Sequence, residues 1–282
     1  MGKIINGKDV AASVKEKIKE FVDERKKIGK SIPKIVSILV GNDGGSIYYM
    51  NSQEKIATSL GVLFQKEILD EKITEDKLID KIKEFNNDNN IHGIMLQLPL
   101  PEHINEKNIV SVISPSKDID GLTTESVGKL YLGEDTLIPC TPNSIMTLLK
   151  SLDIKFQGME AVVLGRSNIV GKPVAQLLLK ENATVTICHS RTKDLKEVTN
   201  RADILVVAIG KPKFLDDTYI KKGAIVIDVG TSSFEGKITG DVDFDKVIDK
   251  AGYLSKVPGG VGALTTTLLI KNACEALKLN ED

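Results

Sequence analysis

A glycine-containing turn, GRSNIVGKP at residues 165–173, has the residue types that bind a phosphate. It follows the apolar run AVVL and precedes an amphipathic segment, so we expect a junction between a buried strand and a helix. At such a junction, free backbone N–H groups and the positive end of the helix dipole point toward a bound anion. Gly165 permits the tight turn and Gly171 permits close helix–strand packing, whereas Ser167 replaces the second glycine of the usual G-x-G-x-x-G pattern. The turn is therefore a variant dinucleotide fingerprint.

A second polar group stands where the adenosine ribose of a dinucleotide would lie. In a Rossmann unit, an Asp or Glu about 20 residues beyond the glycines binds the ribose hydroxyls and favours NAD. The segment CHSRT places Ser190 and Arg191 there instead, and Arg166 adds a guanidinium from the glycine turn. One surface arginine alone is most simply a solvated charge, but these groups together suit a 2′-phosphate and predict NADP rather than NAD. Gly210 and Thr231 follow two later apolar runs and are further candidates for cofactor contacts.

The chain alternates between apolar runs and amphipathic segments of helix length. The first half predicts, in order, helix 9–29, strand 34–41, helix 46–60, strand 62–69, helix 74–90 and strand 91–101. A helix starting near Thr141 and Pro142 leads to a second series: strand 161–164, a helix from 171, strand 184–188, a short helix near 194–200, strands 202–210 and 224–230, a hairpin at 232–241 and a last helix from 266. Strands separated by crossover helices are typical of parallel sheets, so we expect an α/β fold of two units joined by a helix.

Composition excludes several classes of protein. The 282 residues carry a formal net charge of −1, which argues against a nucleic-acid-binding or polybasic membrane surface. No apolar run approaches the roughly 20 residues that span a bilayer, and the N-terminus has no signal-like apolar core. Three cysteines, Cys140, Cys188 and Cys274, lack metal-ligand or disulfide-framework spacing. We expect reduced thiols, no metal site and a cytoplasmic location.

Eight motifs occur in order along both halves of the chain. They are S-x-x-Y (Ser46, Tyr49), QLPLP (97–101), KDIDG (117–121), PCTP (139–142), GRSNIVGKP (165–173), CHSRT (188–192), GDVDF (240–244) and PGGVG (258–262). Through them the chain resembles the methylenetetrahydrofolate dehydrogenase/cyclohydrolase family of one-carbon metabolism over almost its whole length. The resemblance implies a folate-binding catalytic domain at 1–141 with the helix 265–282 packing back on it, a Rossmann-type domain at 142–264, a cleft between them and a homodimer.

The resemblance also assigns residues to the folate substrate. Tyr49 is expected to stack on the folate, Gln97 to hold substrate and catalytic side chain by hydrogen bonds, and Asp120 to accept hydrogen bonds from the pterin. Further substrate contacts are expected from Leu98, Pro99 and Gly260. The residues themselves leave two other interpretations open. Gln97 could be an amide whose hydrogen bonds are satisfied within the protein at a strand end, and the Asp120 carboxylate could serve only to form an Asx turn.

One position departs from the family pattern. The family has a tyrosine and a lysine four residues apart on one helix face, whereas this chain has Tyr49 and Gln53, with Lys55 off that face. Glutamine has no titratable proton. Hydride transfer depends on orientation and electrostatics, but hydrolysis of the methenyl cation moves protons, and general acid–base assistance is worth about 10²–10⁴-fold. We therefore expect an NADP-dependent methylenetetrahydrofolate dehydrogenase whose cyclohydrolase activity is weak or absent.

Three alternatives remain at this stage. In the first alternative, the chain is a bifunctional member of the family that also makes 10-formyltetrahydrofolate, and a water network or Lys55 replaces the function of the missing lysine at position 53. It is instead another two-domain dehydrogenase, such as one acting on shikimate, although QLPLP and KDIDG argue against this. The third alternative is a non-catalytic folate or nucleotide binder.

Overall fold

A computed structural model describes residues 1–281 and divides the chain into two compact units. Unit 1 combines Met1–Ala12 with Pro139–Thr265, and unit 2 combines Ser13–Ile138 with Thr266–Asp282. Each unit has its own parallel sheet. The two-domain α/β architecture expected from the sequence is confirmed.

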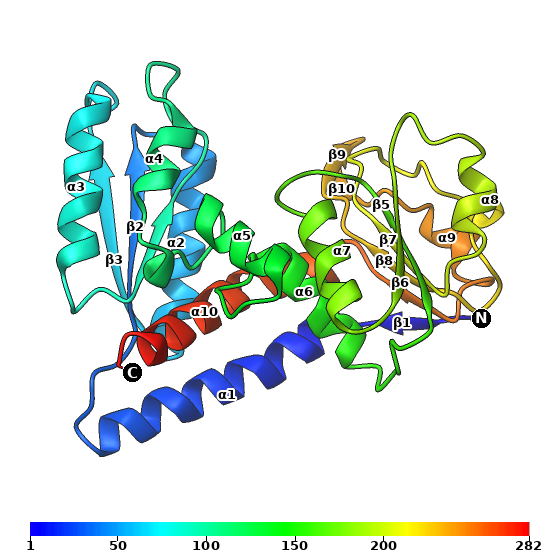
Figure 1. Cartoon of the computed structure of the whole chain (residues 1–282), viewed down its shortest axis with the longest axis horizontal. Helices are drawn as coiled ribbons and strands as arrows, with labels where there is room; N and C mark the ends of the chain where they lie inside the picture. Colours follow the sequence, from blue (N-terminus) through cyan, green and yellow to red (C-terminus); the bar gives the residue numbers. More distant parts are fainter. Residues whose placement is uncertain (282) are drawn as a thin grey trace. The chain divides into compact units, whose positions relative to one another are not determined.

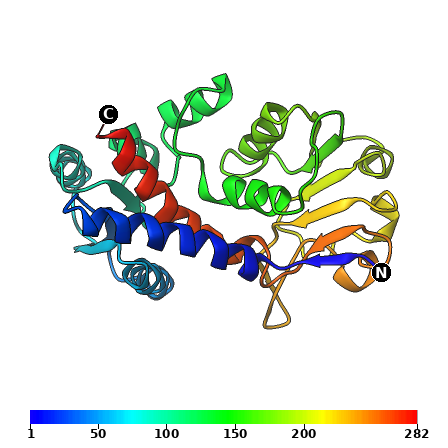
Figure 2. The same cartoon turned by 90° about the horizontal axis from the view of Figure 1, so that it is seen from below.

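Unit 2 is built on a three-stranded parallel sheet in the order β3-β2-β4. The strands are β2 (Lys34–Val40), β3 (Leu63–Leu69) and β4 (Gly93–Leu96), and the crossover helices are α2 (Gly44–Ser59) and α3 (Glu75–Asn87). Figures 1 and 2 show α2 and α3 on opposite faces of this sheet. Leu78, Ile82 and Phe85 of α3 are buried in its core, as their helical spacing predicts.

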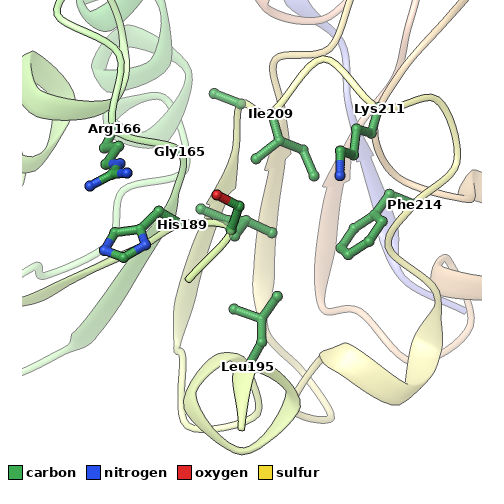
Figure 3. Close-up of a pocket in the computed structure, with 10 residues that line it drawn as sticks. Gly165, Arg166, His189, Leu195, Ile209, Lys211 and Phe214 are labelled. Carbon is green, nitrogen blue, oxygen red and sulfur yellow. The ribbon is translucent and has the colours of Figure 1, made fainter. Parts of the chain in front are cut away.

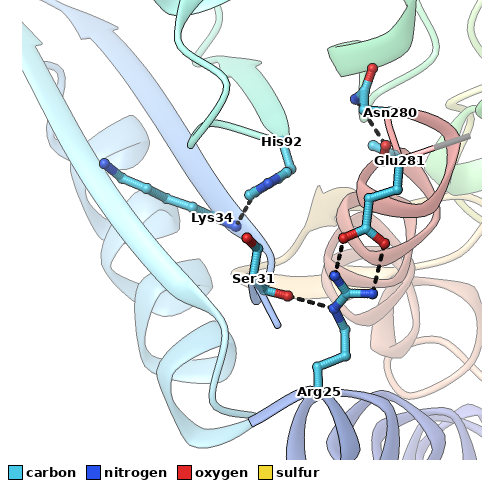
Figure 4. Close-up of polar contacts among 7 residues, drawn as sticks. Arg25, Ser31, Lys34, His92, Asn280 and Glu281 are labelled. Atoms are coloured by element: carbon cyan, nitrogen blue, oxygen red, sulfur yellow. Dashed lines mark hydrogen bonds and ion pairs between the residues drawn. The ribbon is translucent and has the colours of Figure 1, made fainter. Parts of the chain in front are cut away.

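Two long helices complete unit 2. Most of α1 (Gly7–Lys27) lies beside α10 (Thr265–Leu279), which Figure 2 shows as the blue and red helices. The Lys278 ammonium stacks 4.8 Å from the ring centroid of Phe21. Arg25 is ion-paired with Glu281 and also donates to the Ser31 carbonyl (Figure 4). These contacts fix the end of α10 against α1.

The sheet of unit 1 has six parallel strands in the order β1-β11-β8-β7-β5-β6. Its strands are β1 (Lys3–Ile5), β5 (Glu160–Leu164), β6 (Thr184–Cys188), β7 (Ile204–Val207), β8 (Ile225–Asp228) and β11 (Tyr253–Ser255). Its helices are α6 (Cys140–Lys150), α7 (Gly171–Lys180), α8 (Leu195–Thr199) and α9 (Phe244–Val247), and the expected hairpin is formed by β9 (Ser232–Phe234) and β10 (Lys237–Thr239). The central strands are apolar apart from Glu160 at the start of β5 and Asp228 at the end of β8, because both faces of such a sheet are covered.

The structure differs from the sequence-based expectation at the chain's start. Residues 1–12 were expected in the catalytic domain, yet β1 pairs in parallel with β11 and belongs to unit 1. Three residues are too few to show a strand period, so this strand had no detectable pattern. Unit 2 also contains two short helices after β4, α4 (Glu106–Val112) and α5 (Thr124–Leu132). None of the helices formed by residues 1–281 is long and apolar enough to cross a membrane.

Candidate cofactor and substrate sites

A cavity of about 280 Å³ lies at the carboxyl ends of the unit 1 strands, where the strand order reverses around β5. Ligands of open α/β sheets bind at such a switch point. The lining residues include predicted and unpredicted ones: Leu164, Gly165, Arg166, His189, Ser190, Leu195, Ala208, Ile209, Lys211 and Phe214. Figure 3 shows Arg166 and His189 on one side of this cavity and Ile209, Lys211 and Phe214 on the other.

The glycine turn brings β5 and β7 close together. Gly165 has a φ of +132°, and a Cβ there would lie 2.2 Å from the Ala208 carbonyl oxygen. A Cβ on Gly171 would lie 2.3 Å from the Gly165 carbonyl oxygen. Ser167 Oγ accepts hydrogen bonds from the backbone N–H groups of Val170 and Gly171, at 3.2 and 3.3 Å. Only glycine fits the two close approaches, and Ser167 satisfies donors at the start of α7.

The expected ribose side of the cavity contains a histidine that sequence reasoning missed. His189 Nδ1 accepts a hydrogen bond from the Arg191 backbone N–H at 3.1 Å. A neutral imidazole in this arrangement carries its proton on Nε2, which is then a donor. Arg166 and Ser190 line the same cavity, whereas the Arg191 side chain is exposed and lies outside the lining. The motif CHSRT contained the signal for His189, because His189 directly precedes Ser190 and Arg191, the two residues selected from it.

The other two predicted cofactor residues lie at the ends of neighbouring strands. Gly210 follows β7, has a φ of +65° and donates its backbone N–H to Asp241 Oδ2 at 2.9 Å. Thr231 is exposed and follows Gly230 at the end of β8. The backbone N–H of Ile209, which lines the cavity, donates to the same Asp241 oxygen at 2.7 Å. The carboxyl edge of β7 is therefore held by an aspartate to which sequence reasoning gave no role.

Unit 2 contains a buried polar cluster at the carboxyl end of β4. Gln97 Nε2 donates to Gln53 Oε1 and to Ser37 Oγ, each at 2.9 Å. Gln53 and Ser37 are fully buried and Gln97 is 3% exposed. Gln53 Nε2 is also buried and has no hydrogen-bond partner among residues 1–281. The structure thus brings Gln53 and Gln97 together, and adds Ser37, a polar residue inside the apolar run of β2 that sequence reasoning passed over.

The start of α2 connects this cluster to the QLPLP loop. Asp43 caps the helix by accepting from Ser46 N at 2.7 Å and from Ser46 Oγ at 2.9 Å, and these bonds lower the pKa of the Asp43 carboxyl. Ser46 Oγ also contacts the Leu98 carbonyl oxygen at 3.4 Å. Tyr49, one helical turn before Gln53, is 42% exposed. Leu98 and Pro99 are exposed in the same loop.

The KDIDG loop is held by Lys117 and Asp118, which both precede Asp120. Lys117 is buried, and its ammonium donates to the carbonyl oxygens of the last residues of α3 and the residue after them, at 2.8–3.0 Å. Burial lowers the pKa of Lys117. Asp118 accepts from Thr123 N and Ser126 Oγ, both at 2.8 Å, at the start of α5. Asp120, just after these anchors, is half-buried. Sequence reasoning assigned Asp120 a role and missed the two residues that fix its loop.

Gly260 is the one predicted substrate residue that lies in unit 1. It contacts the start of α1, because a Cβ on Gly7 would lie 2.1 Å from the Gly260 carbonyl oxygen. The remaining predicted substrate residues lie in unit 2: Tyr49, Gln53, Gln97, Leu98, Pro99 and Asp120. The candidate cofactor residues all lie in unit 1.

Comparison with known proteins identifies both units. Residues 5–120 match the catalytic domain of tetrahydrofolate dehydrogenase/cyclohydrolase, and residues 139–281 match its NAD(P)-binding domain. The chain is 72% identical over 282 residues to the bifunctional protein FolD of Clostridium botulinum, covering all of both chains. It is also similar to the bifunctional FolD structure of Campylobacter jejuni, with 41% identity, a TM-score of 0.95 and 99% coverage of each chain. The Trypanosoma brucei dehydrogenase-cyclohydrolase, solved with NADP and an inhibitor, has 34% identity and a TM-score of 0.90, with 99% of this chain and 98% of that chain covered.

These relatives correct one expectation. We expected weak or absent cyclohydrolase activity because Gln53 replaces a lysine, and this is wrong: a relative that is 72% identical from end to end is named as bifunctional. The inference equated a missing titratable side chain with a missing reaction. The methenyl carbon is already electrophilic, and hydrogen-bonding amides such as those of Gln53 and Gln97 can orient a water and the substrate without titrating. With both domain models matched in order along its length, the chain belongs to the tetrahydrofolate dehydrogenase/cyclohydrolase family.

Proposed function

We propose that this chain catalyses two successive reactions on folate. The first is NADP-dependent oxidation of 5,10-methylenetetrahydrofolate to the 5,10-methenyl cation, and the second is hydrolysis of that cation to 10-formyltetrahydrofolate. The observation that carries the choice of cofactor is the unit 1 cavity, where Arg166, His189 and Ser190 line the ribose side and no acidic residue is among the lining residues.

When bound, NADP would supply the hydride acceptor for the methylene carbon, and the part of this chain's residues is to bind and orient the cofactor. The pyrophosphate binds against the glycine turn that precedes α7, toward the positive end of the helix dipole. Arg166 and the Nε2 donor of His189 hold the 2′-phosphate, with Ser190 as a neutral donor. Arg191 adds a positive charge near the mouth of the cavity. Gly210 and Thr231 contact the other half of the dinucleotide, at the ends of β7 and β8.

The folate is bound by unit 2 through a stacking face and a set of polar groups. Tyr49 supplies the stacking face, and its 42% exposure leaves the ring available to a ligand. Asp120 accepts hydrogen bonds from the pterin N–H groups. Leu98 and Pro99 provide apolar contacts from the exposed QLPLP loop.

The hydrolysis adds water to the methenyl carbon, and the water oxygen loses both of its protons to become the formyl oxygen. One carbon–nitrogen bond breaks, and that nitrogen gains one of the two protons while the other is released. Gln97 and Gln53 act on this step by orientation, since carboxamides accept and donate hydrogen bonds without changing protonation. Gln53 Nε2 has no hydrogen-bond partner among residues 1–281. It can therefore donate a hydrogen bond in this step when the Gln53 side chain turns toward the substrate. Solvent takes the released proton.

Two earlier expectations stay predictions: a homodimer and a cytoplasmic location. Neither follows from the contacts within one chain. Sedimentation of the purified protein tests the first, and fractionation of cells that express it tests the second.

The test of the proposed function measures the half-reactions separately. Methylenetetrahydrofolate is supplied with NADP or with NAD, and dinucleotide reduction is followed. Methenyltetrahydrofolate is then supplied without dinucleotide, and its decay is compared with the uncatalysed decay. The proposal requires faster reduction with NADP than with NAD and a catalysed decay. Equal use of NAD, or decay at the uncatalysed rate, would contradict it.

A further inference from the structure

Two buried aspartates lie at the carboxyl edge of the unit 1 sheet, behind the wall of the cofactor cavity. Asp228 is the last residue of β8 and is 3% exposed. Asp241 follows the β9–β10 hairpin and is fully buried. Neither lines the cavity. Burying a carboxylate costs free energy unless hydrogen bonds offset the lost hydration. The hydrogen bonds of each aspartate therefore indicate its role in the fold.

Asp241 holds the turn that follows β7. Its Oδ2 accepts the backbone N–H of Ile209 at 2.7 Å and that of Gly210 at 2.9 Å. Its carbonyl oxygen accepts from Leu215 N at 3.0 Å, next to the bridge that pairs Leu215 with Val242. The segment from Ile209 to Leu215 includes the cavity-lining side chains Ile209, Lys211 and Phe214 (Figure 3). One aspartate therefore holds both ends of this wall.

Asp228 holds Asp241 in turn. Asp228 Oδ1 accepts the backbone N–H groups of Gly230 and Asp241, at 3.0 and 2.9 Å, and its Oδ2 accepts that of Val242 at 3.0 Å. The Asp228 backbone N–H is itself bonded to Ser255 Oγ on β11 at 2.8 Å. The end of β8 thus fixes the backbone from which the Asp241 carboxylate extends.

Two glycines leave the space that these carboxylates fill. A Cβ on Gly230 would lie 2.4 Å from Asp241 N and 2.6 Å from Asp241 Oδ1. A Cβ on Gly240 would lie 1.9 Å from Asp228 Oδ2. Asp241 Oδ1 has no hydrogen-bond partner among residues 1–281, so it contacts Gly230 by packing alone. The Asp241 carboxylate is therefore wedged between the turn after β7 and the turn after β8.

We propose that Asp241, fixed by Asp228, is a positioning residue for the dinucleotide: it sets the backbone of the Ile209–Gly210 and Gly230–Thr231 turns against which one half of the cofactor binds. The inference rests on the NADP chemistry proposed above. It assigns Asp241 no contact with the cofactor, because the carboxylate lies behind the turns and has no exposed surface.

The test titrates NADPH into the purified full-length chain and follows nucleotide fluorescence, with unfolding temperatures measured in parallel. Asp241→Ala removes the acceptor of the Ile209 and Gly210 backbone N–H groups, and we expect the dissociation constant to rise about tenfold. Asp241→Asn keeps one oxygen that accepts both N–H groups, so its dissociation constant should stay within about threefold of the wild type. The KM for NADP should rise in Asp241→Ala while the KM for methylenetetrahydrofolate stays unchanged.

A matched control comes from the amino ends of the strands in the same sheet, where Asp203 directly precedes β7. Asp203 also accepts a backbone N–H, that of Glu160 at 3.0 Å, and is ion-paired with Lys221. Asp203→Ala should lower the unfolding temperature without changing NADPH affinity. NADPH affinity in Asp241→Ala within twofold of the wild type, or an equal loss of affinity in Asp203→Ala, would overturn the assignment.

Gly230→Ala provides a second approach to the same carboxylate if Asp241→Ala does not fold. Gly230 has an ordinary φ, and an alanine methyl group there would displace both the Asp241 backbone nitrogen and Asp241 Oδ1, which lie 2.4 and 2.6 Å from the Cβ position. We expect weaker NADPH binding in folded Gly230→Ala, and unchanged binding would contradict the proposal. A wild-type chain that binds no NADPH would overturn the proposed cofactor itself, an outcome distinct from equal affinities in wild type and variants.

Discussion

Gln97 donates from Nε2 to Oε1 of Gln53 over 2.9 Å, which joins the carboxyl end of β4 to the middle of α2. Both side chains are buried, and Gln97 is bonded to Ser37 as well. The position where the family pattern has a lysine is therefore occupied by a neutral amide already engaged with its neighbour. We therefore propose that this pair contributes to hydrolysis by orienting the water and the substrate, and that Gln53 transfers no proton.

The first prediction concerns that pair. Gln53→Met keeps the length of the side chain but removes the acceptor of Gln97 and the buried Nε2 donor. We expect the hydrolysis rate to fall about 10–100-fold and the dehydrogenase rate to change less than about threefold, since hydride transfer depends on the cofactor side. Initial rates of both half-reactions measure this. Gln176→Met, the same substitution at a half-buried site on α7, should leave both rates unchanged, and an equal loss of both activities in Gln53→Met would contradict the assignment.

The second prediction concerns selection of the cofactor. Arg166→Ala removes a guanidinium from the ribose side of the cavity, so the KM for NADP should rise about tenfold or more while the KM for NAD changes little. The effect should shrink at high salt. Arg201→Ala is the matched control, because Arg201 is exposed and lies at the amino ends of the strands, away from the cavity. Its Nε is 3.9 Å from Glu160 Oε2. Parallel increases for NADP and NAD in Arg166→Ala would show that Arg166 does not read the 2′-phosphate.

The third prediction concerns the loop that carries Asp120. Lys117→Met removes the donor to three carbonyl oxygens at the end of α3, and a lost partner for buried polar groups costs about 1–3 kcal/mol. We expect lower stability to urea together with a severalfold rise in the KM for methylenetetrahydrofolate. The exposed Lys107 on α4 gives the control variant Lys107→Met, which should change neither quantity. A stability loss in Lys117→Met without any change in folate KM would separate the loop's anchoring from substrate binding.

The fourth prediction concerns pH and stability. Burial raises the pKa of Asp228 to about 6, from an ordinary value of 3.8. The folded state therefore holds this proton more tightly than the unfolded state, so the stabilising contribution is complete below pH 3.8 and is lost as the pH rises through 6. The free energy of unfolding of the wild type, relative to Asp228→Asn, should fall by up to about 3 kcal/mol between about pH 4 and pH 7.

Asp203 provides a control of opposite sign for this titration. The hydrogen bond from Lys221 lowers the pKa of Asp203, so its stabilising contribution is present above the ordinary value and is lost as the pH falls below it. Urea unfolding of wild type, Asp228→Asn and Asp203→Asn across the acid range measures both. A flat difference between wild type and Asp228→Asn would show that Asp228 does not titrate in this range.

Periodic elements could be predicted from the sequence, and short ones could not. Leu78, Ile82 and Phe85 repeat at helical spacing, so both the helix and its buried face were predictable. The strands Lys3–Ile5 and Tyr253–Ser255 are each three residues long, and their pairing depends on a contact across about 250 positions of the sequence. Nothing local to either strand predicts its partner.

The candidate site shows the same division. Gln53 and Gln97 were selected from motifs, but Ser37, which completes their cluster, lies inside an apolar strand where a serine gives no functional signal. Asp241 lies in the GDVDF motif and Asp228 in the predicted strand 224–230. Their importance depends on which backbone N–H groups they accept, and those donors come from a different strand and turn. Contacts of this kind become visible only once the chain is folded.

The most direct test of the two-reaction account is the decay of methenyltetrahydrofolate with the purified wild-type chain in the absence of dinucleotide. This measurement isolates hydrolysis, the reaction that we expected to be weak or absent because of Gln53. We predict a decay that is proportional to enzyme concentration, exceeds the uncatalysed rate and yields 10-formyltetrahydrofolate. Decay at the uncatalysed rate, in a preparation that still reduces NADP with methylenetetrahydrofolate, would contradict the account.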